Sequence, residues 1–168
     1  MKAEIEAAKQ AGDSVGGTVE CAALGVPAGL GEPMFDGVEN VLSRLAFAVP
    51  GVKGIEFGDG FELATRRGSE TNDPYRMQDG AVCLESNHMG GILGGITNGQ
   101  PLLFRAAFKP TPSISIQQHS VSFSEKKNVE LSVKGRHDPC IVPRGLPCME
   151  AVMAIGIIGM MLEAGAWN

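Results

Sequence analysis

The clearest periodic pattern in the chain lies at residues 38–49, with the sequence VENVLSRLAFAV. Its apolar residues fall three and four positions apart, as they do along one face of an α-helix. They are Val38, Val41, Leu42, Leu45, Ala46 and Val49. Pro50 follows, and a proline disfavours helical geometry in the residue before it. The pattern therefore predicts an amphipathic helix that ends at Pro50.

Strands are predicted by a different spacing. Residues 129–133, VELSV, alternate apolar and polar side chains, which is typical of a strand with one solvated face. Apolar runs at residues 15–24 and 102–108 also predict strands. Shorter strands are expected within residues 53–61 and at residues 113–116 and 121–123.

The remaining segments complete a mixed architecture. We expect helices at residues 1–10 and from Pro147 to about residue 164, and a polar, mobile surface loop at residues 64–80. Helices and strands do not alternate regularly, which favours an α+β fold with a largely antiparallel sheet. The length of 168 residues suits one domain, residues 1–168.

The most apolar run, residues 151–162, is a candidate for burial. It contains 12 residues and is interrupted by Gly156 and Gly159. A helix of that length is shorter than the ~30 Å core of a bilayer. We therefore expect a buried helix that packs closely on a neighbour, and no membrane partner.

Composition narrows the classes of partner. The net charge is −5 and aromatic residues make up 5% of the chain, which argues against binding to nucleic acid. Any anion site must therefore be local. Four cysteines with no C-x-x-C pair indicate free thiols and a cytoplasmic setting.

Three segments could carry chemistry, and each has a structural alternative. Residues 85–100, ESNHMGGILGGITNGQ, form either a binding loop or a structural turn rich in glycine. Residues 108–115, FKPTPSIS, place one ammonium and two hydroxyls on a backbone stiffened by two prolines, which suits a phosphate monoester. The alternative is an edge turn with a solvated lysine.

The third segment, residues 134–151, is KGRHDPCIVPRGLPCMEA. Arg136 and Arg144 can each bind a carboxylate or a phosphate through two hydrogen bonds. Asp138 is then either a base or one half of a buried Arg–Asp bridge. The neighbouring arginines disfavour a metal site at His137, Asp138 and the cysteines, so no metal is expected.

Taken in order, the motifs of this chain resemble those of chorismate synthase. The resemblance covers residues 13–161. The motifs are GDSVGG, VPAGLGEP, VKGIEFGDGF, GSETND, SNHMGGILGGITNGQPL, FKPTPSI and KGRHDPCIVPRGLPCMEA. This sequence has no counterpart of several features of the family's amino-terminal portion. They are a Ser-His-Gly segment, a second catalytic histidine and several arginines. The chain is therefore expected to be the carboxyl-terminal half of the family's β-α-β sandwich.

The resemblance implies an activity and a cofactor. In the family, 5-enolpyruvylshikimate 3-phosphate loses phosphate in a 1,4-elimination that gives chorismate. Reduced FMN is required, and NADPH is one candidate reductant. The family forms a homotetramer, and we expect a dimer if half of the enzyme is missing. The alternatives are an FMN-binding fragment or an interaction module without turnover of its own.

The resemblance also assigns roles to residues. Asp138 corresponds to the catalytic carboxylate near flavin N5, and Arg136 to a contact with FMN and substrate. The KPTPS residues correspond to contacts with FMN, chiefly its phosphate; they are Lys109, Pro110, Thr111, Pro112 and Ser113. The backbones of Pro50, Gly51 and Gly94 also correspond to cofactor contacts, although Gly51 replaces the usual alanine. The GSETND loop is expected to fold over the site.

Overall fold

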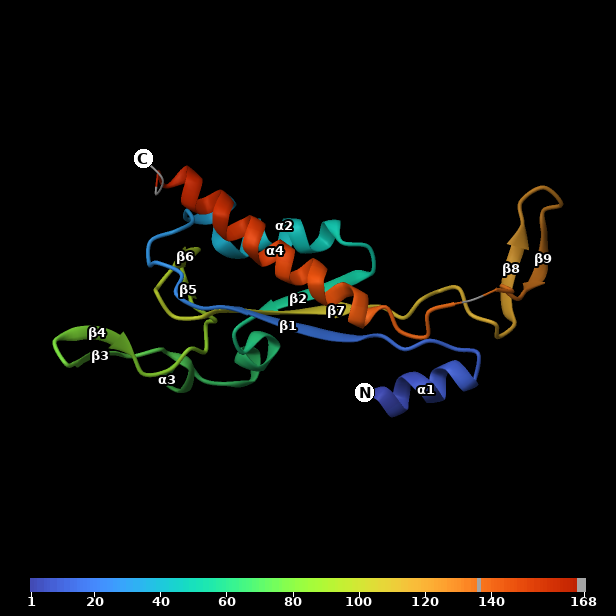
Figure 1. Cartoon of the computed structure of the whole chain (residues 1–168), viewed down its shortest axis with the longest axis horizontal. Helices are drawn as coiled ribbons and strands as arrows, with labels where there is room; N and C mark the ends of the chain where they lie inside the picture. The colour runs from blue at the N-terminus through green and yellow to red at the C-terminus, as the bar shows by residue number, and fades with distance from the viewer. Residues whose placement is uncertain (136, 166–168) are drawn as a thin grey trace.

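The centre of the fold is a three-stranded antiparallel sheet, seen in a computed structural model that describes residues 1–135 and 137–165. Its order is β1-β7-β2, with β1 at Gly17–Ala23, β7 at Leu102–Phe108 and β2 at Val52–Phe57. Helices α2 (Val38–Ala48) and α4 (Val142–Glu163) lie together over one face of this sheet (Figure 1). The predicted α+β fold with an antiparallel sheet and packed helices is confirmed.

The alternation of β7 explains which face the helices cover. Leu102, Phe104, Ala106 and Phe108 are buried, and the residues between them are only half-buried. The four buried residues belong to one hydrophobic core with side chains of α2 and α4. Each strand thus turns one set of side chains to the helices and the other set away from them.

The opposite face of the sheet carries a charged row. Arg105 pairs in register with Glu20 of β1 and with Glu56 of β2. Its Nε atom lies 3.2 Å from Glu56 Oε1 and 3.8 Å from Glu20 Oε2. The row explains how a charged side chain is accommodated in the middle of a central strand.

Short elements surround this centre. Helix α1 (Lys2–Gln10) precedes β1, the 3₁₀ helix η1 (Met34–Asp36) precedes α2, and β5 (Ile92–Leu93) pairs with β6 (Ile96–Thr97). Two hairpins project at opposite ends of the molecule (Figure 1). They consist of β3 (Tyr75–Gln78) with β4 (Ala81–Leu84), and of β8 (Gln118–Ser122) with β9 (Lys127–Leu131).

Some predicted elements differ from the structure. The polar stretch expected to be a loop contains the end of a 3₁₀ helix, η2 (Gly60–Thr65), a helical turn, α3 (Gly68–Thr71), and strand β3. Residues 113–116 are not a strand, and the preceding prolines remove backbone donors that a strand would need. The strand predicted at residues 129–133 is β9, which lies two residues earlier because it pairs in register with β8.

Helix α4 begins earlier than expected, at Val142 rather than after Pro147. Pro143 occupies its first turn, where backbone N–H groups have no partner within the helix. Pro147 then lies inside the helix at the loss of one hydrogen bond. The core contacts of Val142, Gly145 and Met149 keep this first part of the helix on the sheet.

Helix α4 also has an open apolar face. By length and composition its 22 residues could cross a membrane. One third of its most apolar 18-residue stretch is buried within the molecule. Leu146, Ile155, Ile158 and Leu162 are at least 48% exposed. The helix therefore buries one side in this core and leaves the other uncovered by the described residues.

Two glycines of α4 provide a matched test of its packing. A Cβ atom on Gly145 would lie 2.5 Å from the ring of buried Phe108, whereas nothing lies within 4 Å of one on Gly159. We expect Gly145→Ala to lower the free energy of unfolding by about 2 kcal/mol through overpacking. Gly159→Ala should raise it by about 1 kcal/mol through helix propensity. Urea denaturation measures both, and equal effects would contradict the close packing of α4 on β7.

Candidate functional site

Four segments that are distant in sequence meet at one end of the central sheet. They are residues 12–16 before β1, residues 50–51 before β2, residues 109–115 after β7, and residues 137–141 before α4. The backbone N–H of Lys109 donates to the carbonyl of Gly51 at 2.8 Å, and that of Ser115 donates to Gly12 at 2.9 Å. The N–H of Val15 donates to the carbonyl of Pro139 at 2.8 Å. These bonds bring the KPTPS segment and the RHDPC segment to one region.

The KPTPS segment presents its polar groups on a stiff backbone. Lys109 is exposed, and Pro110 and Pro112 fix the chain on either side of Thr111. The hydroxyl of Ser14 donates to the carbonyl of Thr111 at 2.6 Å. The hydroxyl of Thr111 itself is buried and has no hydrogen-bond partner among the described residues. Such a group normally has a partner, so this hydroxyl is a candidate ligand contact.

Asp138 forms an ion pair at the start of α4. Its Oδ2 atom lies 2.7 Å from Nη1 of Arg144. The Arg144 side chain is 78% exposed and that of Asp138 is 37% exposed, so the pair is not the buried bridge considered from the sequence. An exposed pair contributes at most about 1 kcal/mol. Both side chains are therefore free to change partners when a ligand binds.

Gly51 occupies a turn that excludes larger residues. Its φ is +95°, in the region that favours glycine. A Cβ atom would also lie 2.7 Å from Cδ1 of Ile141. This geometry accounts for a glycine where the resemblance leads us to expect alanine, and Pro50 beside it is exposed.

One residue assigned from the resemblance, Gly94, is not brought to this region. Gly94 lies in the turn between β5 and β6, and the next residue, Gly95, accepts a hydrogen bond from Val38 at the start of α2. Gly51 follows the end of α2, whose 11 residues span about 16 Å. Gly94 is therefore about one helix length from Gly51. Arg136 lies outside the described residues.

The paired glycines have structural roles. Gly94 and Gly95 both have positive φ, as a two-residue hairpin turn requires. A Cβ atom on Gly90 would lie 2.4 Å from the backbone nitrogen of Gly58, and one on Gly91 would lie 2.6 Å from the carbonyl oxygen of Pro101. The turn interpretation therefore accounts for Gly90, Gly91 and Gly95, and only Gly94 has open space around it.

The loop that includes GSETND is tied to the neighbouring glycine-rich segment. Asp73 is 9% exposed and accepts hydrogen bonds from the Ser86 hydroxyl and from the N–H groups of His88 and Met89. His88 Nδ1 also lies 2.6 Å from Asp59 Oδ2. These contacts hold residues 59–73 against residues 86–89. Closure of the loop over a ligand stays a prediction.

The Asp73 carboxylate makes stability depend on pH. Burial raises its pKa, but the hydrogen bonds and the His88 charge outweigh burial, so the pKa is lower than the ordinary value of 3.8. Its stabilisation is therefore complete above that value and is lost as pH falls through the lower pKa of the folded state. We expect Asp73→Asn to cost about 1–3 kcal/mol at pH 7 and less at pH 3.

Urea denaturation at the two pH values measures this difference, with Asp79→Asn at the exposed β3–β4 turn as the control. A cost for Asp73→Asn that does not change with pH would contradict the role of its charge.

Two hollows differ in their chemistry. One of about 240 Å³ adjoins the four-segment region and is lined by Lys9, Gly12, Asp13, Ser115, Gly135, His137 and Pro139. Small-molecule pockets usually measure roughly 300–1,000 Å³, so this hollow suits only part of a ligand.

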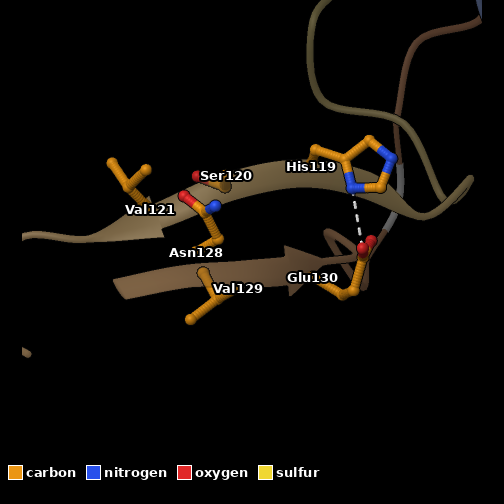
Figure 2. Close-up of a pocket in the computed structure, with 6 residues that line it drawn as sticks. All are labelled: His119, Ser120, Val121, Asn128, Val129 and Glu130. Carbon is orange, nitrogen blue, oxygen red and sulfur yellow. Dashed lines mark ion pairs between the residues drawn. The ribbon is translucent and has the colours of Figure 1, made fainter. Parts of the chain in front are cut away.

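The other hollow, of about 400 Å³, lies beside the β8–β9 hairpin (Figure 2). Its lining consists of His119, Ser120, Val121, Asn128, Val129 and Glu130. His119 and Glu130 point toward each other, with Nδ1 2.7 Å from Oε1 (Figure 2). The two ionisable groups of this lining therefore pair with each other and do not form an anion site.

The sequence interpretation assigned no role to Ser14. The available signal was GDSVGG, in which a polar pair is followed by glycines that permit close approach of another backbone. A Cβ atom on Gly16 would lie 2.4 Å from the carbonyl oxygen of Phe108. Residues 12–17 can therefore run directly beside the start of the KPTPS segment.

Comparisons with known proteins agree with these motifs. A family model described as chorismate synthase matches residues 1–162. The chorismate synthase of Korarchaeum cryptofilum is 52% identical over 164 residues, which cover 98% of this chain and 45% of that protein. The Pyrococcus abyssi enzyme is 51% identical over 168 residues, covering 100% of this chain and 47% of the relative.

A solved structure gives the same result. A crystal structure of chorismate synthase superposes with a TM-score of 0.78 at 31% identity, covering 97% of this chain and 42% of the other. The chain spans about half the length of the curated relatives it matches. On this evidence, the chain belongs to the chorismate synthase family.

Proposed function

We propose that residues 1–168 form one domain, the carboxyl-terminal half of a chorismate synthase. The proposed reaction is the 1,4-elimination of phosphate from 5-enolpyruvylshikimate 3-phosphate to give chorismate, in the cytoplasm. This chain supplies the part that binds FMN, and its amino-terminal counterpart supplies the remaining catalytic groups.

One observation carries the proposal. In a member of this family, the KPTPS segment and the segment containing Asp138 are both hydrogen-bonded to residues 12–15. These bonds hold two loops at one end of the sheet. One loop carries a lysine and two hydroxyls, and the other carries a carboxylate. Phosphate recognition and proton transfer both need such fixed polar groups.

The residues present fit FMN. Lys109 supplies a charge for the phosphate, and the buried hydroxyl of Thr111 lacks a partner among the described residues. Ser113 adds a second hydroxyl, and the prolines at 110 and 112 keep the three groups in fixed relation. Reduced FMN, when bound, lends electron density to the substrate as its phosphate departs, and NADPH is one candidate reductant. Asp138 is the proposed base, and Arg144 pairs with its carboxylate.

The exposed apolar face of α4 supports the proposal that another part of the enzyme covers it. Leu146, Ile155, Ile158 and Leu162 leave a large apolar surface, which monomeric proteins rarely expose. We propose that the amino-terminal half covers this face in the complete enzyme and that the enzyme is a homotetramer. By itself, the chain should associate, with a dimer as the simplest form.

A chimera tests the function directly. We would join this chain to the amino-terminal half of the Pyrococcus abyssi enzyme and assay chorismate absorbance anaerobically with reduced FMN. The chimera should form chorismate, whereas this chain alone should not. A chimera that binds FMN without turnover would instead favour the flavin-binding fragment. Turnover by the chain alone would contradict the assignment of the chain as half of the enzyme.

A further inference from the structure

We propose that Ser14 is a positioning residue for the FMN phosphate and acts through the carbonyl of Thr111. The inference rests on the proposed function, because it concerns the same site. It concerns the GDSVGG motif, to which the resemblance gave no role.

Four hydrogen bonds hold residues 109–115, which contain the KPTPS segment. The Lys109 N–H donates to Gly51 at the start, and the Ser14 hydroxyl donates to Thr111 at 2.6 Å. At the end, Ser115 donates its N–H to Gly12 and accepts from the Ser132 hydroxyl. Pro110 and Pro112 carry no N–H group, so the segment has few backbone donors of its own. Two of these four bonds therefore involve residues 12–14.

The Ser14 bond is the central one. It fixes the carbonyl of Thr111, and between two prolines this residue has little freedom to rotate. Fixing the peptide also fixes where the Thr111 side chain begins. The hydroxyl of Thr111 is the buried group that lacks a partner among the described residues. Ser14 therefore determines where this hydroxyl can meet a phosphate oxygen.

The same segment links the two loops of the site. Val15, next to Ser14, donates its N–H to the carbonyl of Pro139 at 2.8 Å. Consecutive Cα atoms lie about 3.8 Å apart, so the two loops are fixed to adjacent residues of one short segment. Asp13 in turn accepts the N–H of Ser14 at 2.8 Å, which fixes the segment locally. The position of the phosphate contacts relative to Asp138 is thus set by residues 13–15.

Comparing FMN with riboflavin isolates this role, because the two ligands differ only by the phosphate. We would titrate this chain with each flavin and follow flavin fluorescence. Ser14→Ala should weaken FMN binding about tenfold, the loss expected for one positioning hydrogen bond. Riboflavin affinity should stay within about twofold of the wild type, since the ring contacts are unchanged.

Two further variants complete the test. Ser14→Thr keeps the hydroxyl and should restore FMN binding to within about threefold of the wild type. Ser120→Ala, the same deletion on β8, should change neither affinity. Retained riboflavin binding also reports that each variant is folded.

The outcomes separate the inference from the function on which it rests. If the wild type binds FMN more tightly than riboflavin and Ser14→Ala keeps that preference, the positioning role is wrong and the proposed function stands. Equal losses for FMN and riboflavin would indicate a general structural role and would also overturn it. If the wild type does not distinguish the two flavins, the phosphate assignment itself fails, and the inference fails with it.

Discussion

Lys109→Glu should weaken FMN binding by at least about 100-fold, which amounts to about 2.8 kcal/mol. Lys109 directly follows β7, and its N–H is fixed by Gly51. The fold therefore fixes the backbone of Lys109 beside the residues that carry the hydroxyls, and its exposed side chain supplies the cation. The substitution removes a charge-assisted hydrogen bond and adds repulsion between carboxylate and phosphate. Fluorescence titration with FMN measures the loss.

The control for this prediction is Lys127→Glu. Lys127 lies on β9 and pairs with Glu125 at 2.7 Å, and its replacement changes the net charge by the same amount. It should leave FMN affinity unchanged. Equal binding by the wild type and Lys109→Glu would refute the phosphate role of Lys109. Equal losses in both variants would show that net charge, rather than this site, attracts the flavin.

Asp138→Asn should lower chorismate formation by the chimera about 10³-fold, within the range of general acid–base contributions. The amide keeps the size of the carboxylate, so FMN affinity should change by less than about twofold. The ion pair with Arg144 contributes little at this exposure, and the fold should therefore survive its loss. Steady-state assays with the reduced flavin measure turnover, and flavin titration measures binding.

Asp36→Asn provides the matched control, because η1 lies at the opposite end of α2 from the candidate site. It should leave turnover unchanged. Full activity of Asp138→Asn would remove this carboxylate from the mechanism. A parallel loss of turnover and FMN binding would assign it to ligand binding instead.

Local patterns predicted the central elements well. Strand β7 has the predicted bounds, Leu102–Phe108, and α2 ends one residue before the predicted limit. In both elements the apolar residues recur at the spacing of the element, because one face of each is buried in the core. Their type and extent therefore depend mainly on nearby residues.

The β3–β4 hairpin was missed because its apolar residues are divided between two strands. Tyr75 pairs with Leu84 and Met77 with Val82, so the four share one face only after the chain has turned. The Asp-Gly pair at residues 79–80 is a standard hairpin signal, and it lay inside a stretch interpreted as polar. The start of α4 was also missed. Contacts with the sheet keep the helix intact although Pro147 removes one of its hydrogen bonds.

The candidate site could be predicted in its residue types but not in its assembly. The prolines and lysine of KPTPS suited a phosphate contact but also an edge turn with a solvated lysine, and the phosphate contact stays a prediction. No local pattern showed that Ser14 reaches Thr111 across 97 residues, or that α2 separates Gly94 from Gly51. Both facts arise from the tertiary arrangement, which single-sequence periodicity does not encode.

Hydrogen exchange of backbone amides, with and without FMN, shows whether the KPTPS segment and the segment containing Asp138 contact one flavin. We expect FMN to slow exchange in residues 111–115 and in residues 138–141 together, and Lys109→Glu to abolish both effects. Slower exchange in only one of these segments, or mainly in the β8–β9 hairpin, would contradict a shared flavin site.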